Sequence, residues 1–407
     1  MPLDRISPVL SQAVTDLETQ GRAKGRETVV VGVLPPEGNR GPRFLLEGAG
    51  EKEFLRMNSN SYLGMGLRPE VVAAEEAGTE RYGAGPGAVR FISGTYAPHV
   101  ELERRLAAFH AREAAMIFSS AYATVIGVIS PLVTAETIVI SDELNHNSII
   151  NAIRLSRPAD KAVYKHLEMD GLREALGAAR GRAKRVVVVT DGVFSMRGDH
   201  APMDVLLGIA RDFDAAFEEG VVVVMDDSHG VGAFGTTGRG TEEYTGSPPV
   251  DVLIGTLGKA FGVNGGYVAS SAPVIRYLRE TAPMYIYSNP ITPGEATAAL
   301  ATLELLTGDL GVELLERLRA LTHRFKDGLE RLGFETLPGE HPVVPLMVRD
   351  TARTRQLVRH LYENGILATG LAYPVVPRGD EEIRFQVNAD HTEYDIDYVL
   401  RALEAAR

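Results

Sequence analysis

Short, strongly β-branched segments that end in polar residues limit the folds open to this chain. Strands are predicted at Val186–Thr190, at Val221–Asp226, within VDVLIGTLGK (250–259) and at GYVAS (266–270), and a helical pattern separates the first two. Strands so uniformly apolar are typical of a sheet whose two faces are both covered. The alternation of strand and helix therefore predicts an α/β fold with a mostly parallel sheet flanked by helices.

The pattern divides the chain into three parts. Residues 1–55 combine an amphipathic helix with two short apolar runs around a Pro/Gly/Asn cluster, which indicates a β-ribbon. Residues 56–295 contain the α/β pattern and are predicted to be the large domain. Residues 296–407 are predicted to form linking helices and a smaller α+β domain, whose last helix begins at a capping box of Thr392 and Asp395.

Composition excludes several classes of function. The formal net charge is −12, which argues against nucleic acid or an anionic membrane surface as the main partner. The chain has no cysteine, so disulfides, thiolate metal sites and cysteine nucleophiles are excluded, and no metal site is predicted. The N-terminus lacks the pattern of a signal peptide, and no run approaches the ~18 apolar residues of a spanning helix. A cytoplasmic protein is the expectation.

Polar side chains follow the predicted strands at the points where they end. These groups are Thr190-Asp191, Asp226-Asp227-Ser228-His229 and Thr256-Leu257-Gly258-Lys259. In open parallel sheets, ligands bind beyond the carboxyl ends of the strands. A lone aspartate at a strand end more often caps a turn, at odds of roughly three to one. Two acids and an imidazole together are costly to desolvate unless a cation meets them.

Lys259, in GTLGKAFGVNGGY (255–267), is open to several interpretations. The spacing lacks the G-x-x-x-x-G-K-[ST] pattern of a phosphate loop, and YGAGPGAVRF (82–91) follows no evident strand, which weakens a dinucleotide fingerprint. A surface turn would have polar neighbours, whereas Val250–Ile254 and Ala260-Phe261 are largely apolar. A lysine desolvated at a strand end is a nucleophile towards carbonyls. With an aspartate on a neighbouring strand, it suits pyridoxal 5′-phosphate.

The chain resembles the α-oxoamine synthases, a group of fold-type-I pyridoxal-phosphate enzymes. Seven segments in order carry the resemblance: NSNSYLG, GAGPGAVRFISGT, SDELNHNSII, TDGVFSM, DDSHGVGAFGTTGRG, GTLGKAFG and IRFQVNADHT. VRFISGT, TDGVFSM, TLGKAFG and AYPVVPRG are most similar to the 2-amino-3-ketobutyrate CoA ligases, also called glycine C-acetyltransferases. The fold that this implies is a large domain with a mostly parallel sheet and a smaller α+β domain.

The resemblance also implies roles for individual residues. Lys259, Asp226, His229 and His146 would be catalytic: the lysine forms a Schiff base, Asp226 pairs with the pyridine nitrogen, His229 contacts the phenolic oxygen and His146 stacks on the ring. The remaining cofactor contacts would come from Ser195 beside the ring, from Ala121, Tyr122 and Thr256 at the phosphate, and from Ser288 and Asn289 of a partner subunit. Arg384 and Asn60 would bind the amino acid.

The reaction implied is a C-acyltransfer between a small amino acid and an acyl thioester in a homodimer with shared active sites. The first hypothesis is glycine with a short acyl-CoA such as acetyl-CoA, or the reverse CoA-dependent cleavage. The alternative is a biosynthetic synthase that uses alanine or serine, another acyl-CoA or a carrier-protein thioester. Ser61 and Asn147 depart from the usual family pattern on the substrate side and motivate the alternative. A non-catalytic cofactor-binding protein and a conventional aminotransferase are the remaining options.

Overall fold

The protein is described by a computed structural model that covers residues 2–373 and 376–407. Pro374 and Val375, within the AYPVVPRG segment, lie outside the described residues. The chain forms two compact units, Asn60–Leu318 and the pair of segments Met1–Ser59 and Arg319–Arg407. The chain passes between the units twice, between Ser59 and Asn60 and within one helix, α12 (Asp309–Arg331).

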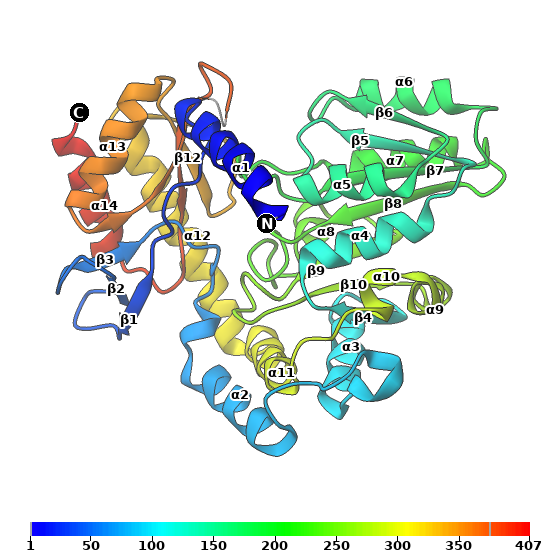
Figure 1. Ribbon diagram of the computed structural model, residues 1–407, viewed down its shortest axis with the longest axis horizontal. Coiled ribbons are helices and arrows are strands. Elements are labelled where there is room, and N and C mark those ends of the chain that lie inside the picture. Colours follow the sequence, from blue (N-terminus) through cyan, green and yellow to red (C-terminus); the bar gives the residue numbers. More distant parts are fainter. Residues whose placement is uncertain (1, 374–375) are drawn as a thin grey trace. The chain divides into compact units, whose positions relative to one another are not determined.

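A seven-stranded sheet is the centre of the unit Asn60–Leu318 (Figure 1), with the order β4-β10-β9-β8-β7-β5-β6. The strands are β4 (Ala114–Phe118), β5 (Thr137–Asp142), β6 (Asp160–Tyr164), β7 (Arg185–Asp191), β8 (Val221–Asp226), β9 (Val252–Thr256) and β10 (Gly266–Ser270). The strands from β6 to β9 are parallel, and β10 runs antiparallel to both β9 and β4. The prediction of a mostly parallel sheet is confirmed.

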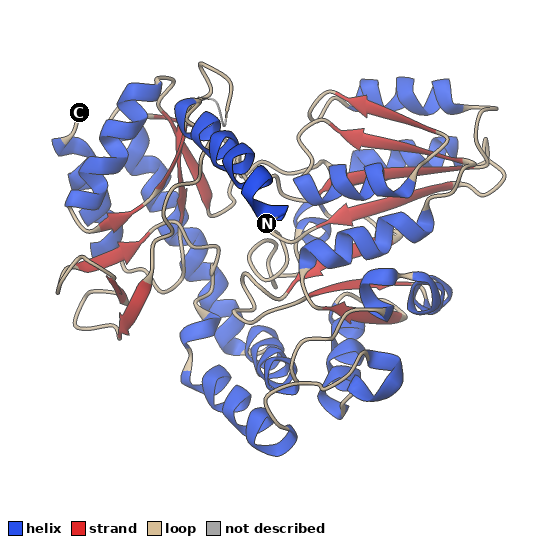
Figure 2. Cartoon of the chain, viewed as in Figure 1, coloured by secondary structure: helices blue, strands red, loops and turns tan. Residues whose placement is uncertain are grey.

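Helices cover both faces of this sheet (Figure 2). The helical elements of this unit, besides the start of α12, are η1 (Met65–Leu67), α2 (Pro69–Tyr82), η2 (Arg90–Gly94), α3 (Ala97–Phe109), α4 (Ala121–Leu132), α5 (Asn147–Ser156), α6 (Met169–Ala179), α7 (Met203–Asp214), α8 (Thr241–Thr245), α9 (Ala272–Thr281), α10 (Pro283–Ile286) and α11 (Pro293–Thr307).

Side chains along each strand alternate between the two faces of the sheet, and this explains why the predicted strands are apolar throughout. In β7, Val187 and Val189 join the apolar cluster that includes side chains of α4, α5 and α9. Val186 and Val188 join the second cluster, with side chains of α6 and α7. Because successive side chains point to opposite faces, a strand covered on both sides has no position for a polar residue until it ends.

The other unit contains two small sheets. Its elements are α1 (Pro2–Thr19), β1 (Val30–Leu34), β2 (Arg43–Leu46), β3 (Glu53–Arg56), β11 (Glu335–Thr336), β12 (Val343–Met347), α13 (Thr351–Glu363), β13 (Ile366–Leu367), β14 (Thr369–Leu371), β15 (Glu382–Gln386) and α14 (Glu393–Ala405), with the end of α12. The sheets have the orders β1-β2-β3-β13 and β11-β12-β15-β14. The predicted capping box is present, since Thr392 accepts a hydrogen bond from the Asp395 N–H and Asp395 accepts one from that of Thr392.

The N-terminal ribbon belongs to the same unit as the C-terminal residues. β1 and β2 pair antiparallel, as the sequence predicts, while β3 pairs in parallel with β13 from the far end of the chain. Asp395 links the segments as well, because its carboxylate accepts from the Gly41 N–H at 2.9 Å and from buried Arg43 at 2.5 Å. Such long-range pairs give no local pattern in the sequence. Among the described helices, none is long and apolar enough to span a membrane.

Candidate active site

A pocket opens where several strands of the seven-stranded sheet end. Its lining consists of Ala121, Tyr122, His146, Ser148, Asp191, Ser195, Asp226, Ser228, His229 and Lys259. Asp191 and Asp226 are the last residues of β7 and β8 and are direct partners in the parallel ladder. Lys259 follows β9, in the turn after Thr256. The pocket therefore lies at the carboxyl ends of the strands, where ligands bind in open parallel sheets.

The floor of the pocket carries two buried carboxyl groups. The Asp226 side chain accepts a hydrogen bond from the Ser228 N–H at 3.1 Å, and the Asp191 side chain accepts one from the His146 N–H at 2.8 Å. Burial, and next the nearby charge of Asp226, raise the pKa of Asp191 well above its ordinary value. Two adjacent buried carboxylates repel each other, so one takes a proton or a cation is bound between them.

His146 is held as a neutral imidazole. It is the N-cap of α5, and its Nδ1 accepts a hydrogen bond from the Ser148 N–H at 3.2 Å and lies 2.7 Å from the Ser148 hydroxyl. Desolvation by the surrounding protein lowers its pKa, Lys259 lowers it further, and Asp226 opposes them. With Nδ1 as the acceptor, the remaining ring proton is on Nε2. An uncharged ring of this kind can lie against a flat aromatic ligand.

His229 is oriented by Tyr62, which the sequence did not single out. The Tyr62 hydroxyl lies 2.7 Å from His229 Nδ1, and both residues are buried. Tyr62 has a left-handed backbone, with φ of 41°, which is rare for a bulky side chain. Such conformations persist where surrounding contacts hold them and are frequent at functional sites. The sequence signal that could have identified Tyr62 as a site residue is its place within the NSYLG segment.

The N-terminus of α4 forms the wall occupied by Ala121 and Tyr122. Ser120 is the N-cap, and its hydroxyl accepts from the Ala123 N–H at 3.2 Å. The first N–H groups of a helix have no intrahelical acceptor, and the helix dipole adds partial positive charge there. This wall has the properties of an anion-binding site, as a phosphate requires.

Tyr122 belongs to a polar cluster that includes Asn147. The Tyr122 hydroxyl donates to Asn147 Oδ1 at 2.9 Å, and Asn151 Nδ2 donates to Tyr122 Oη at 2.6 Å and to Asn147 Oδ1 at 2.8 Å. The Tyr122 ring stands edge-on to His146, with 6.4 Å between ring centroids. Asn147, which departs from the usual family pattern, therefore fixes an aromatic side chain that lines the pocket.

Asp227 differs from the sequence expectation. It does not line the pocket with Asp226 and His229; its carboxylate accepts hydrogen bonds from the Thr241 N–H and hydroxyl at 2.7 and 2.6 Å. A Cβ at Gly192, Gly230 or Gly240 would come within 1.9–2.2 Å of its oxygens. This close packing, with burial as the main cause, raises the pKa of Asp227 to about 8. The acid is a structural anchor for the 227–241 loop.

Two glycines near Lys259, Gly262 and Gly266, allow close backbone packing rather than widening the pocket. A Cβ at Gly262 would lie 2.2 Å from the Gly66 backbone nitrogen, and one at Gly266 would lie 2.5 Å from Ala121 Cα. The space that a side chain at Gly262 would need is therefore filled by the backbone at Gly66. A Cβ at Gly258 would meet its nearest neighbour among the described residues at 3.5 Å, so this glycine keeps space beside Lys259.

Five predicted site residues do not line this pocket: Thr256, Ser288, Asn289, Asn60 and Arg384. The Thr256 hydroxyl donates to the Gly265 carbonyl at 3.2 Å and accepts from the Gly258 N–H at 3.1 Å, which shapes the lysine turn. Ser288 and Asn289 follow α10. Asn60 Oδ1 lies 3.4 Å from the Tyr62 hydroxyl, and Arg384 lies on β15 of the other compact unit. Their proposed ligand contacts stay predictions.

Comparison with known proteins decides the family. The aminotransferase class I and II family matches residues 52–403. The chain belongs to this family. It is 36% identical over 397 residues to 8-amino-7-oxononanoate synthase of Thermosipho melanesiensis, covering 97% of this chain and 96% of that protein. Identity to the same enzyme of Symbiobacterium thermophilum is 41% over 362 residues, 89% of each chain.

A solved structure agrees with these relatives. Serine palmitoyltransferase from S. paucimobilis, with bound PLP, superposes with a TM-score of 0.86 at 26% identity, covering 99% of this chain and 98% of that one. Within the aminotransferase family, the chain is of the α-oxoamine synthase type, an acyltransferase-type PLP enzyme. The predictions of fold, of an enzyme and of pyridoxal 5′-phosphate as cofactor are confirmed at the level of the family.

The pocket residues fit pyridoxal 5′-phosphate chemically. Lys259 offers an amine for an aldehyde, Asp226 a buried carboxylate for a ring nitrogen that carries a proton, and α4 an N-terminus for a phosphate. The buried Ser228 hydroxyl, another lining group, has no hydrogen-bond partner within the described part of the chain. A buried polar atom without a partner is rare in native proteins and indicates a missing ligand or water. Asp191, Ser148 and Ser228 are lining residues to which the sequence assigned no role.

Proposed function

We propose that this protein is an α-oxoamine synthase that joins alanine to a pimeloyl thioester, as the 8-amino-7-oxononanoate synthases do. The observation that carries the proposal is the match to those enzymes over nearly the whole length of both chains. A C–C bond would form between the alanine α-carbon and the pimeloyl carbonyl carbon while the C–S bond breaks and the thiol leaves. Loss of the alanine carboxylate as CO₂ would then give the 8-amino-7-oxononanoate skeleton. These relatives support the alternative from the sequence better than glycine with acetyl-CoA.

The pocket residues have complementary roles in this proposal. When bound, pyridoxal 5′-phosphate supplies an electron-accepting ring that stabilises negative charge at the substrate α-carbon. Lys259 would hold the cofactor and accept the substrate α-proton on its Nζ. Asp226 keeps the proton on the ring nitrogen, because a buried carboxylate stabilises a cation beside it.

Other residues would bind and orient the cofactor and the amino acid. The N–H groups of Ala121 and Tyr122 would hold the phosphate, and the neutral His146 ring would face the cofactor and keep water from it. His229, oriented by Tyr62, contacts the phenolic oxygen. The family resemblance assigns the carboxylate of the amino acid to Arg384. Within its own unit, the amide of Gln386, oriented to satisfy its neighbours, accepts from Arg384 Nε at 2.8 Å and Nη2 at 3.1 Å and so restricts the guanidinium.

A matrix of substrates tests the proposal. The purified holoenzyme receives alanine, glycine or serine with acetyl-, pimeloyl- or palmitoyl-CoA, or with pimeloyl carrier protein, and products are identified by mass. We expect the highest kcat/KM for alanine with a pimeloyl thioester, with one CO₂ per product. A higher kcat/KM for glycine with acetyl-CoA would return the assignment to the first hypothesis, and transamination without a thioester would reject the synthase.

We also propose that two copies share their active sites. Phe91, Ile92 and Tyr287 are 68%, 67% and 79% exposed, a large apolar exposure beside Ser288 and Asn289. Phe91 and Tyr287 line one surface hollow, and exposed apolar groups that lie together are typical of interfaces. A second copy covering them would bring its Ser288 and Asn289 towards the phosphate, as the family resemblance implies.

Complementation tests this arrangement. We expect Lys259→Ala and Asn289→Ala chains to be inactive or weak alone. When they are mixed under conditions that exchange subunits, one site of the mixed dimer has both native residues. We expect activity to return on mixing and a dimer in sedimentation. No recovery between chains that do exchange would show that Asn289 acts in its own subunit, and a fully active monomer would reject the dimer.

A further inference from the structure

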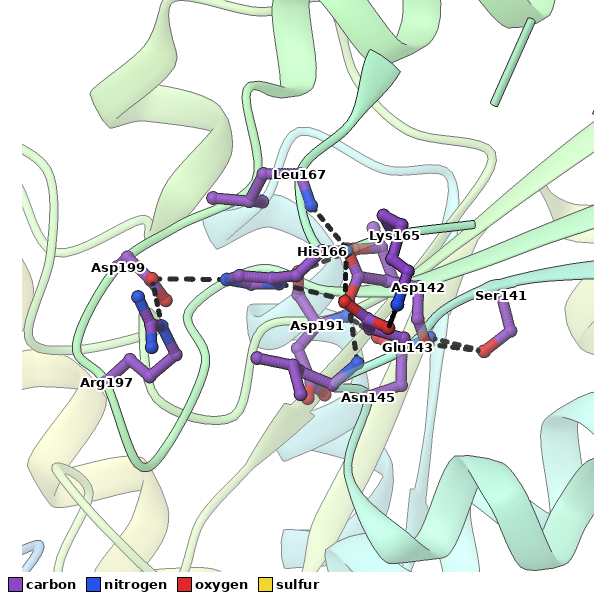
Figure 3. A network of polar contacts seen from close by, with 12 residues as sticks. Ser141, Asp142, Glu143, Asn145, Lys165, His166, Leu167, Asp191, Arg197 and Asp199 are labelled. Carbon is purple, nitrogen blue, oxygen red and sulfur yellow. Dashed lines mark hydrogen bonds and ion pairs between the residues drawn. The ribbon is translucent and has the colours of Figure 1, made fainter. Parts of the chain in front are cut away.

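His166 lies outside the pocket, between two carboxylates (Figure 3). Its Nδ1 is 3.1 Å from Asp142 Oδ1, and its Nε2 is 3.2 Å from Asp199 Oδ2. The imidazole is largely buried, and its ring packs edge-on against Phe194, with 4.4 Å between centroids. Both ring nitrogens therefore face acceptors, and only the imidazolium form can donate from both at once.

Asp142 connects His166 to the loop that carries His146. As the last residue of β5, it accepts hydrogen bonds from the N–H groups of Leu144 at 2.8 Å and Leu167 at 2.9 Å. Its side chain is fully buried. One carboxylate thus fixes the turns after both β5 and β6, and the turn after β5 leads directly into His146.

Asn145 completes this side of the network. Its amide donates to the Val189 carbonyl and accepts from the Asp191 N–H, both at 2.8 Å. The Asp191 carboxylate then accepts from the His146 N–H. Asn145 Nδ2 also donates to the Ser141 hydroxyl at 2.9 Å, which donates to the Asp142 carbonyl at 3.1 Å. Hydrogen bonds therefore link the His146 N–H to His166, and Figure 3 shows the part of this set from Asn145 to His166.

Asp199 connects His166 to the other wall of the pocket. It lies in the 193–200 hairpin, where the Phe194 N–H donates to the Asp199 carbonyl at 2.9 Å and Val193 pairs with His200. Arg197 Nε donates to the same Asp199 carboxylate at 2.7 Å. Ser195, which lines the pocket, is at the turn of this hairpin.

We propose that His166 is a positioning residue. Its imidazolium bridges Asp142 and Asp199 and so holds two walls of the pocket, the His146 loop and the Ser195 hairpin, in fixed positions relative to each other. The inference rests on the proposed function only in taking the pocket as the cofactor site. No catalytic contact is assigned to His166. Its effect passes through the loops that it joins.

The bridge depends on pH. Burial lowers the pKa of His166, but hydrogen bonds and charge from Asp142 and Asp199 outweigh it and raise the pKa to about 9. The other charged groups near the ring are Arg197, bound to Asp199, and the Lys165–Glu143 pair, whose Glu143 also accepts from the His166 N–H. Since the folded pKa exceeds the unfolded one, the stabilisation is complete below about pH 6.5 and is lost as pH rises through about 9.

Histidine NMR tests the protonation directly. The holoenzyme is prepared with labelled histidine as wild type, as His166→Gln and as Lys165→Gln, a control that breaks the neighbouring exposed ion pair and leaves the bridge intact. The imidazole signal missing in His166→Gln should titrate near pH 9 in the other two proteins. Titration of that signal near 6.5 would overturn the proposal.

Hydrogen exchange and cofactor affinity test the positioning. With His166→Gln, amides of residues 193–200 and 143–148 should exchange at least about tenfold faster, the order expected for loss of a charged hydrogen bond, and the Kd for pyridoxal 5′-phosphate should rise by a similar factor. Asp199→Asn, which keeps the side-chain shape, provides a second variant if His166→Gln does not fold. Unchanged exchange in both loops would overturn the proposal, whatever substrate the enzyme proves to use.

Discussion

Glu103 offers a direct test of how a buried charge supports the predicted interface segment. On α3, its carboxylate accepts hydrogen bonds from Arg90 at 3.1 and 3.2 Å, from Arg279 Nη2 at 2.8 Å and from the Ile117 N–H at 3.0 Å. Its side chain is 8% exposed and that of Arg90 is 4% exposed. Arg90 begins η2, the turn that presents Phe91 and Ile92 to solvent.

The substitution Glu103→Gln removes the charge and keeps the shape. Two guanidinium groups then share one neutral amide, and removal of one partner of a buried ion pair costs about 3–5 kcal/mol. Because the amide oxygen can still accept from the Ile117 N–H, we expect the low end, a loss of about 3 kcal/mol in the free energy of unfolding. Urea-induced unfolding followed by circular dichroism measures this loss as a lower midpoint at unchanged slope.

Glu101 provides the matched control on the same helix. It pairs with Arg104 and Arg105 in exposed ion pairs, so Glu101→Gln should change the midpoint little. If Glu103→Gln unfolds at the same urea concentration as Glu101→Gln, the buried network does not stabilise this region and the reasoning is refuted. If Glu103→Gln does lower the free energy of unfolding, it should also weaken self-association in sedimentation, because η2 carries the exposed apolar side chains Phe91 and Ile92.

Three further predictions concern the pocket and its supports. Lys259→Ala should abolish the visible absorbance of the lysine-bound cofactor and lower kcat by roughly 10²–10⁴ or more, while phosphate-dependent cofactor binding persists; retained absorbance would reject Lys259 as the tether. Tyr62→Phe removes the hydroxyl that orients His229 and should lower kcat about tenfold with little change in the KM of the amino acid, and equal changes in both would indicate a substrate contact instead. Asp227 has a folded pKa of about 8, above its unfolded value near 4, so it makes stability fall as pH rises between these values. Asp227→Asn should remove that part of the decline, measured as urea midpoints at pH 5 and 7.5, and an unchanged pH dependence would contradict a buried neutral acid.

Much of the larger unit was predictable because its signals are local. β8 begins and ends where the sequence predicts, at Val221 and Asp226, because a strand covered on both faces stays apolar until it leaves the core. The capping box of α14 was predictable for a similar reason, since Thr392 and Asp395 satisfy each other's backbone over four residues. Polar residues at strand ends then indicated the pocket without any tertiary information.

Long-range features could not be predicted in this way. The antiparallel direction of β10 depends on the turn that carries Lys259, and the pairing of β3 with β13 joins residues more than 300 positions apart in the chain. Asp227 was grouped with Asp226 because the two are adjacent in sequence. Its true environment, with Thr241 and three glycines, is assembled from separate loops.

The same distinction explains why the cofactor was easier to predict than the substrate. The groups suited to pyridoxal 5′-phosphate follow from strand ends and one helix N-terminus, which belong to a fold that superposes with serine palmitoyltransferase. We expect the choice of amino acid and acyl group to depend on side chains around that frame, and Asn147, which accepts a hydrogen bond from the Tyr122 hydroxyl, is one of them. Motifs near the cofactor can therefore resemble glycine C-acetyltransferases while relatives that match the chain nearly end to end have other substrates. Substrate choice in this chain should thus respond to substitutions at Asn147 more than to changes in the strands.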